Sequence, residues 1–298
     1  MLDRVDEIID TFISELNDKR SRELFEKISS GKKLRAKLIL KIAPNSKDAP
    51  FLAAIVELIH AASLLHDDVI DDALTRRGNS SINALFGNKS AIMLGDILYS
   101  KAFYELAALD KEVAKVVSNA VVKLSVGELM DVELSKEFNE DEDLYFDMIY
   151  KKTASLIEAA SKSAALLEGV DSEKFALYGK NLGLAFQIID DILDITAESS
   201  KLGKPSMHDF FEGKVTLPYI KMYKKLDEDG KKRLLKLYKK ELNESETGWI
   251  REKMKSTEAI KESVEIVNFL ANEALLSIKE YQKDDLERVV RDMVEREY

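Results

Sequence analysis

The sequence has no cysteine, only four prolines and a single tryptophan. Without cysteine it can form no disulfide, thiol nucleophile or cysteine metal site, which is typical of proteins from reducing compartments. Basic residues are in the minority, because 45 Lys and Arg face 55 Asp and Glu, for a formal net charge of -10. A chain this acidic is a poor candidate for nucleic-acid binding, which needs a basic surface to neutralise phosphates.

The first residues, MLDRVDEIIDTFISEL, are acidic and amphipathic. They lack the basic and apolar regions of a signal peptide. No apolar run approaches the roughly 20 residues that cross a bilayer. We therefore expect a soluble, cytoplasmic protein.

The positions of the prolines predict long helices. Residues 51–204 and 219–298 contain no proline, the residue that breaks helix interiors. Apolar residues recur with helical spacing in five tracts, which are 51–70, 90–109, 111–134, 142–169 and 172–195. Candidate caps flank them, namely Ser90, Asp171 or Ser172, and Gly169. No strand pattern stands out, so the sequence predicts a single all-α domain, 1–298, with a core of long helices.

Two aspartate clusters follow one design. One is 67-DDVIDD-72 and the other is 190-DDILD-194, and each ends an apolar tract and leads into a basic loop. Residues four apart share a helix face, so Asp67 lies beside Asp71, and Asp190 beside Asp194. Neighbouring carboxylates repel unless a cation joins them, and oxygen-only ligands suit magnesium. A single acidic cluster could be a solvated helix end, but the repetition favours a metal site.

The same stretches resemble a known family. DDVIDD followed by RRG, and FQIIDDILD followed by GK and GKVTLP, are similar to the motifs of the trans-prenyltransferases, or polyprenyl diphosphate synthases. The resemblance extends from about residue 30 to residue 220, with the motifs in the same order. It implies an all-α isoprenoid synthase-type bundle of long helices around a central cavity. It also implies a homodimer, magnesium as cofactor, and no transmembrane segment, although the apolar product makes transient membrane contact plausible.

The reaction implied by this resemblance is a head-to-tail condensation. An allylic diphosphate ionises, the double bond of isopentenyl diphosphate attacks the allylic cation, and loss of a proton leaves a chain five carbons longer. The resemblance assigns metal binding, through about three magnesium ions, to the aspartates of both motifs: Asp67, Asp68, Asp71, Asp190, Asp191 and Asp194. Among these, Asp67, Asp71 and Asp190 would be direct ligands and the others outer ones.

The resemblance also assigns the two diphosphate pockets. Residues matched to the allylic diphosphate are Arg76, Lys152, Thr153, Gln187, Lys204 and Lys214, of which Lys152, Gln187 and Lys204 are also expected to be catalytic. Residues matched to isopentenyl diphosphate are Lys32, Arg35, His60 and Arg77. Three positions depart from the family pattern, namely Ser30 in place of the first glycine of GGKxxR, Met207 in place of glycine, and Asp131 where glutamine is frequent.

Product length is predicted from the residues four and five positions before Asp67, which are Ser63 and Ala62. In the family, a bulky aromatic residue there stops elongation early, whereas small residues leave the tunnel open. Each added isoprene unit buries about five carbons, worth roughly 3–4 kcal/mol, so the tail stays in an apolar tunnel until something blocks it. We expect a long-chain product, octaprenyl (C40) as the first choice, extended from farnesyl or geranylgeranyl diphosphate, for quinone side chains. Candidate floor residues are Phe103 and the stretch from Val117 to Leu124.

Other functions remain open at this point. The chain could be a farnesyl or geranylgeranyl diphosphate synthase with a shorter product. A terpene cyclase shares the fold, but its second motif mixes Asn, Ser and Glu, whereas 190-DDILD-194 is all aspartate. A non-catalytic subunit of a heteromeric synthase typically loses one aspartate motif, and a purely structural bundle needs neither.

Overall fold

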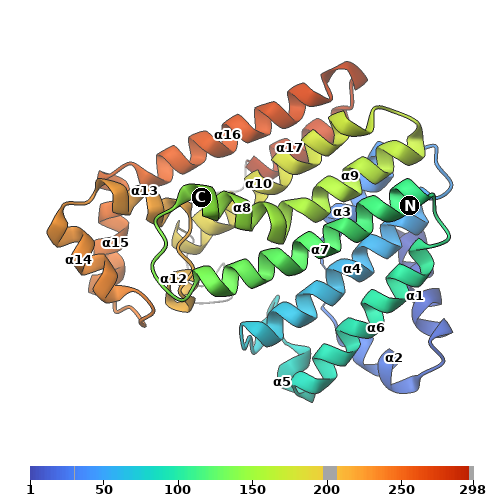
Figure 1. The fold of residues 1–298 in the computed structure, drawn as a ribbon, viewed down its shortest axis with the longest axis horizontal. Helices are drawn as coiled ribbons and strands as arrows, with labels where there is room; N and C mark the ends of the chain where they lie inside the picture. The colour runs from blue at the N-terminus through green and yellow to red at the C-terminus, as the bar shows by residue number, and fades with distance from the viewer. Residues whose placement is uncertain (30, 197–206, 295–298) are drawn as a thin grey trace. The chain divides into compact units, whose positions relative to one another are not determined.

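The computed structural model describes residues 1–29, 31–196 and 207–294, and within these ranges the fold is almost entirely helical (Figure 1). Two compact units are present. Unit 1 consists of residues 1–124 and 156–179, and unit 2 consists of residues 125–155 and 180–298. Three helices contribute residues to both units: α7 (Lys111–Leu134), α9 (Ser155–Glu168) and α10 (Ser172–Thr196). The all-α prediction is confirmed, while the single-domain prediction stays a prediction.

Unit 1 is organised around α4 (Ala49–Ile70), the helix that ends in the first aspartate motif. It packs against α6 (Asn88–Leu106), α3 (Leu34–Ile42), α1 (Leu2–Glu15) and α5 (Ile82–Phe86), and α2 (Lys19–Phe25) packs on α1 and α6. Among the described residues, α4 is also the one helix long and apolar enough to cross a membrane, and 56% of its apolar window is buried. We interpret it as a core helix, because it packs against α6, α3, α1 and α5 and more than half of its apolar window is buried by them.

Unit 2 places the second aspartate motif at the end of α10. The first helix that lies wholly in unit 2 is α8 (Glu142–Ile149), which continues directly into a π-helical turn, η1 (Tyr150–Ala154). The later part is built around α13 (Leu217–Lys225), which packs against α8, α14 (Glu228–Leu237), α15 (Glu244–Ser256) and α16 (Ala259–Ser277). The remaining elements are α12 (His208–Glu212), the 3-10 turn η2 (Lys279–Tyr281) and α17 (Asp284–Val294), which packs on α16.

Most predicted helix boundaries agree with the structure to within a few residues. The Asp171 side chain accepts the N–H groups of Glu173 and Lys174 at the start of α10, as expected for a cap. Gly169, with φ +75°, ends α9. The Ser90 prediction is wrong, because α6 already begins at Asn88, after Gly87 with φ +83°.

The sequence showed no strand pattern, and the structure adds a short hairpin to the all-α fold. Thr75–Arg76 (β1) pairs antiparallel with Asn79–Ser80 (β2), and Arg77 and Gly78 form the turn between them. Both turn residues have positive φ, +53° and +77°, which is the geometry of a two-residue hairpin. Strands of two residues are too short to show alternation in a sequence.

Candidate active site

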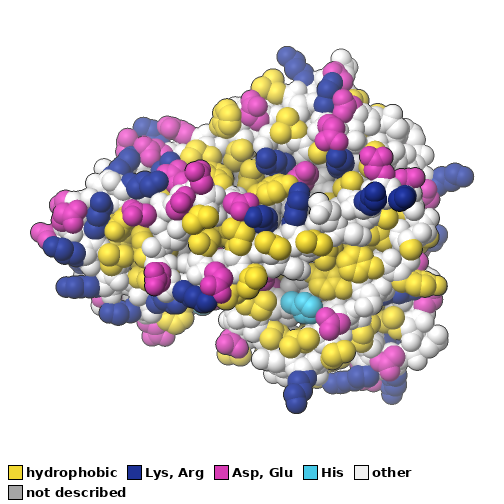
Figure 2. Space-filling view, viewed as in Figure 1, with side chains coloured by type: hydrophobic (Ala, Val, Ile, Leu, Met, Phe, Trp, Pro, Cys, Tyr) yellow, Lys and Arg dark blue, Asp and Glu magenta, His cyan; other side chains and the backbone are white. Residues whose placement is uncertain are grey.

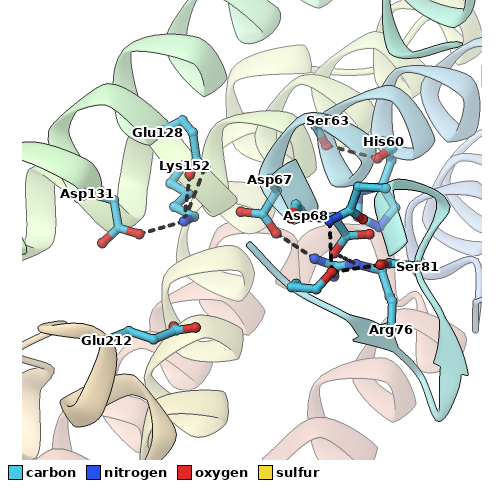
Figure 3. Close-up of polar contacts among 12 residues, drawn as sticks. His60, Ser63, Asp67, Asp68, Arg76, Ser81, Glu128, Asp131, Lys152 and Glu212 are labelled. Atoms are coloured by element: carbon cyan, nitrogen blue, oxygen red, sulfur yellow. Dashed lines mark hydrogen bonds and ion pairs between the residues drawn. The ribbon is translucent and has the colours of Figure 1, made fainter. Parts of the chain in front are cut away.

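The first aspartate motif lies at the C-terminal end of α4, in unit 1. Asp67 and Asp68 face Arg76 of the following hairpin, at 2.7 Å from Asp67 Oδ2 to Arg76 Nη2 and 2.6 Å from Asp68 Oδ1 to Arg76 Nε (Figure 3). Asp71 caps the helix, and its N–H donates to the Asp67 carbonyl at 2.9 Å. Asn83 donates to the carbonyls of Asp68 and Ala73, which fixes the chain that leaves the motif.

In this motif, the oppositely charged neighbours and burial shift the pKa values of Asp68 and Arg76 in opposite directions. Burial raises the pKa of Asp68, with Asp67 and Asp71 adding to the rise, while Arg76 lowers it. Burial lowers the pKa of Arg76, but the Asp67 and Asp68 carboxylates outweigh burial, and the pKa is raised overall. The guanidinium therefore supplies the positive charge that this acidic cluster requires.

The two arginines of the hairpin contact different partners. Arg76 contacts the aspartates, whereas Arg77 donates from Nη1 to the carbonyl of Ser29 at 2.9 Å, beside the SGKKLR segment. A side chain at Gly31 would meet the Arg77 guanidinium at 2.6–2.7 Å, so the missing Cβ leaves room for it. Arg76 is the last residue of β1, whereas Arg77 is the first turn residue with φ +53°, and this change of backbone direction accompanies the separation of the two side chains.

Arg77 lies in a second cationic cluster with Arg35 and His60. Burial and the neighbouring Arg77 lower the pKa of Arg35, and Glu57 opposes them. No described residue pairs with Arg35 Nε. The Glu57 carboxylate accepts the N–H of Ala36 at 3.0 Å, at the start of α3, and burial raises its pKa. Sequence reasoning missed Glu57, whose only signal was a lone acid within an apolar helix. Of the residues predicted to bind isopentenyl diphosphate, Lys32 is exposed on the same segment. Ser30, the departure from the family pattern, lies outside the described residues.

His60 provides a pH-dependent test of this cluster. Burial and the charges of Arg35, Arg77 and Arg76 hold the pKa of His60 well below its ordinary value. Unfolding lets the imidazole take up a proton near pH 6.5, so the folded protein loses stability as pH falls below that value. Between pH 6.5 and 5, the free energy of unfolding of the wild type should fall by up to about 2 kcal/mol more than that of His60→Gln. Denaturant unfolding of both proteins without substrates measures this, and equal acid losses would refute a buried neutral His60.

The chain-length residues differ in their surroundings. Ala62 is fully buried, whereas Ser63 is half-buried, and its hydroxyl donates to the His60 carbonyl at 2.9 Å (Figure 3). Ser63 lies four residues before Asp67 and therefore on its face of α4. Ser63, not Ala62, is thus the better position for a side chain that meets a growing tail. Of the candidate floor residues, Phe103 is 37% exposed, while Val117 and Leu124 are buried.

In unit 2 the π turn presents Lys152 and Thr153. Lys152 Nζ donates to Asp131 Oδ2 at 2.6 Å and to Glu128 Oε1 at 3.2 Å, both on α7 (Figure 3). A Cβ on Gly127 of α7 would lie 2.3 Å from the Lys152 backbone nitrogen, and one on Gly183 of α10 would lie 2.5 Å from Ala154 Cα. These glycines let both helices approach the turn closely, and π turns are frequent at functional sites.

The second aspartate motif is partly turned into unit 2. Asp190 is half-buried, while Asp191 and Asp194 are buried. Asp191 accepts hydrogen bonds from Tyr145 and Gln187, and burial raises its pKa to about 8. Asp194 Oδ2 accepts the N–H of Asp209 at 3.2 Å, at the start of α12. Asp191 and Asp194 thus have contacts with the protein, and the assignment of Asp190 as the direct ligand stays a prediction.

The other predicted allylic residues also have contacts in unit 2. Thr153 donates to Gln187 Oε1 at 2.7 Å, and Lys214 Nζ lies 2.9 Å from Glu212 and 4.0 Å from Asp131. Lys204 lies outside the described residues. No group of three or more His, Asp or Glu side chains converges on one metal position within the described ranges. Carboxylates that repel one another should converge only once a cation is present, and Arg76 already acts as such a cation on Asp67 and Asp68. Magnesium prefers oxygen ligands, so the aspartate side chains of the two motifs suit this ion.

Comparisons with known proteins agree with this arrangement. Residues 18–256 match the model of the polyprenyl synthetase family. The chain belongs to this family, so it is a prenyltransferase. It is similar to the octaprenyl pyrophosphate synthase of Helicobacter pylori, with a TM-score of 0.95 and 42% identity over 99% of this chain and 98% of that one. The predicted family and fold are thereby confirmed.

Two other relatives show the range of the family. A polyprenyl synthase from Caulobacter crescentus, solved with calcium and isoprenyl diphosphate, has a TM-score of 0.84 and 27% identity over 100% and 98% of the two chains. The short chain isoprenyl diphosphate synthase of Methanothermobacter thermautotrophicus is 37% identical over 75% of this chain and 77% of its own. The predicted synthesis of a long-chain trans-prenyl diphosphate is supported by the solved octaprenyl neighbour.

Proposed function

We propose that the protein condenses isopentenyl diphosphate with an allylic diphosphate, farnesyl or geranylgeranyl, to give octaprenyl diphosphate for quinone side chains. This proposal rests mainly on the different positions of the two hairpin arginines. Arg76 faces the aspartate motif, and Arg77 faces the Arg35 and His60 cluster. One site that binds metal and another that is purely cationic suit two different diphosphates.

Three physical demands of the reaction are met by this chain's own residues. The charge on the departing diphosphate must be neutralised, and Arg76, Lys152 and Lys214 are cations suited to that task. The second substrate must be positioned, which we assign to Lys32, Arg35, His60 and Arg77. The allylic cation must be kept from water, which an apolar lining provides.

Magnesium ions, bound through Asp67, Asp71 and Asp190, would neutralise the leaving group and so favour its departure. Support comes from the oxygen-only donor set and from the calcium in the Caulobacter crescentus neighbour. We propose a cytoplasmic location, from the absence of cysteine.

The test of this function is incubation of the pure protein with magnesium, isopentenyl diphosphate and farnesyl diphosphate, followed by extraction and sizing of the products. We expect linear C40 chains and no turnover after chelation of the metal. Cyclic hydrocarbons would indicate a cyclase, and no turnover a non-catalytic subunit. A C15 or C20 product would instead support a shorter-chain synthase, the alternative that the Methanothermobacter thermautotrophicus relative favours.

We also propose that the protein is a homodimer that buries the exposed apolar side of α6. Ile92, Met93, Phe103 and Tyr104 are 41%, 56%, 37% and 75% exposed. Hydrophobic side chains lie over the region of α6 in the lower right of Figure 2. A monomer rarely leaves large adjoining apolar side chains in water, so a second copy is the expected cover.

The double variant Met93→Glu/Tyr104→Glu should halve the mass measured by light scattering, because it places charge in the apolar contact. Phe269→Glu is the matched control, since Phe269 is 63% exposed on α16. An unchanged mass for the α6 variant would rule out this surface.

A further inference from the structure

A buried hydrogen-bond chain in unit 2 begins at Tyr145, a residue that the proposed function does not use. Tyr145 is fully buried on α8, and its hydroxyl donates to Asp191 Oδ2 at 2.5 Å. A phenol hydroxyl carries its proton at neutral pH, so Tyr145 is the donor in this pair. Tyr145 therefore occupies one of the two carboxylate oxygens.

The chain continues from Asp191 to residues assigned to the allylic diphosphate. Gln187 Nε2 donates to Asp191 Oδ1 at 2.9 Å, and Gln187 Oε1 accepts from Thr153 Oγ1 at 2.7 Å. With the Tyr145 hydroxyl donating to Oδ2 and the Gln187 amide donating to Oδ1, both oxygens of Asp191 act as acceptors, which selects the amide orientation in which the Gln187 nitrogen faces Asp191. That orientation turns the Gln187 oxygen to Thr153 and commits the threonine proton to it.

We propose that Tyr145 is a positioning residue for the condensation. By holding the Asp191 carboxylate, it fixes the orientation of Gln187 and, through Gln187, the hydroxyl of Thr153. This inference rests on the proposed function, because Gln187 and Thr153 matter for catalysis only if they face the allylic substrate. Small displacements of groups that face a reacting centre cost large factors in rate.

The simpler reading is that Tyr145 only satisfies a buried carboxylate and contributes stability alone. A double-mutant cycle separates the two. Tyr145→Phe removes one hydroxyl and keeps the ring, and Gln187→Ala removes the side chain on which Tyr145 is proposed to act. We expect Tyr145→Phe to lower kcat about tenfold, with KM for isopentenyl diphosphate unchanged.

In the cycle, the double variant should be no slower than Gln187→Ala alone, because the two residues act as one unit. If the two effects multiply, or if Tyr145→Phe keeps wild-type kcat, the proposal is overturned. Should Tyr145→Phe fail to fold, Asp191→Asn takes its place in the cycle, with the same required outcome.

Tyr219 supplies a matched control in the same unit. It is also fully buried, it stacks on Phe210 with ring centroids 4.4 Å apart, and its hydroxyl has no partner among the described residues. Tyr219→Phe should therefore keep kcat and KM. An effect equal to that of Tyr145→Phe would show that any buried phenol matters, and would overturn the proposal.

A readout that does not depend on turnover completes the test. The side-chain amide resonances of Gln187 in an NMR spectrum should shift in Tyr145→Phe and stay in place in Tyr219→Phe. An inactive wild-type protein would refute the proposed function, while unshifted Gln187 resonances would refute the role of Tyr145.

Discussion

Asp67→Asn is expected to lower kcat/KM by at least about 10²–10³-fold, because it removes the charge of a proposed direct metal ligand. Asparagine has nearly the same size, so packing at the end of α4 is kept. The variant also loses the ion pair with Arg76, 2.7 Å long in the structure, so the metal-free protein should lose some stability. Steady-state turnover with saturating isopentenyl diphosphate measures the first effect, and Mn²⁺ titration followed by electron paramagnetic resonance measures metal binding directly.

The control for this variant is Asp10→Asn, an acid-to-amide change at an exposed position of α1. It should leave both turnover and Mn²⁺ binding unchanged. Activity of Asp67→Asn within tenfold of wild type would remove Asp67 from the metal site.

Ser63→Phe is expected to shorten the main product from C40 to C15 or C20 while turnover continues. The half-buried Ser63 shares a helix face with Asp67, so a ring there would lie one turn from the diphosphate motif and meet the tail after few additions. Each isoprene unit that loses its apolar surroundings forfeits roughly 3–4 kcal/mol, which is enough to end elongation. Chromatography of the extracted products measures the change.

Two matched variants sharpen this prediction. Ser63→Ala should keep the wild-type product, because it adds no bulk. Ala62→Phe should instead destabilise the protein by about 1–3 kcal/mol, because Ala62 is fully buried and the ring overpacks the core. An unchanged product from Ser63→Phe would mean that the tail does not pass this face of α4.

The helices and the loop that carries both arginines could be predicted from the sequence, because proline positions and apolar spacing are local signals. Spacing also placed Asp67 and Asp71 one turn apart at the end of α4, where the Asp71 N–H donates to the Asp67 carbonyl. Spacing could not show whether an aspartate side chain points into the core or away from it. Asp191 turns inward because Tyr145, 46 residues away, offers it a hydroxyl, and such a pairing leaves no local pattern. Tyr145 itself is indistinguishable in sequence from any core aromatic.

The π turn was invisible for another reason. Tyr150–Ala154 has an ordinary helical composition, and only the hydrogen bonds of the folded chain reveal the wider turn. The hairpin of β1 and β2 was missed because each strand has two residues.

The π turn also sets a register. Tyr145 and Thr153 are eight residues apart and contact Asp191 and Gln187, which are one turn apart on α10. In a regular α-helix, residues eight apart point about 80° away from each other, whereas residues seven apart differ by only about 20°. Because the π turn holds one extra residue, side chains eight residues apart across it point in nearly the same direction, as those seven residues apart do in a regular α-helix. Side chains in this segment can therefore be exchanged with local consequences, but the number of residues cannot: deleting one would restore an unbroken α-helix and leave either Tyr145 or Thr153 facing away from α10.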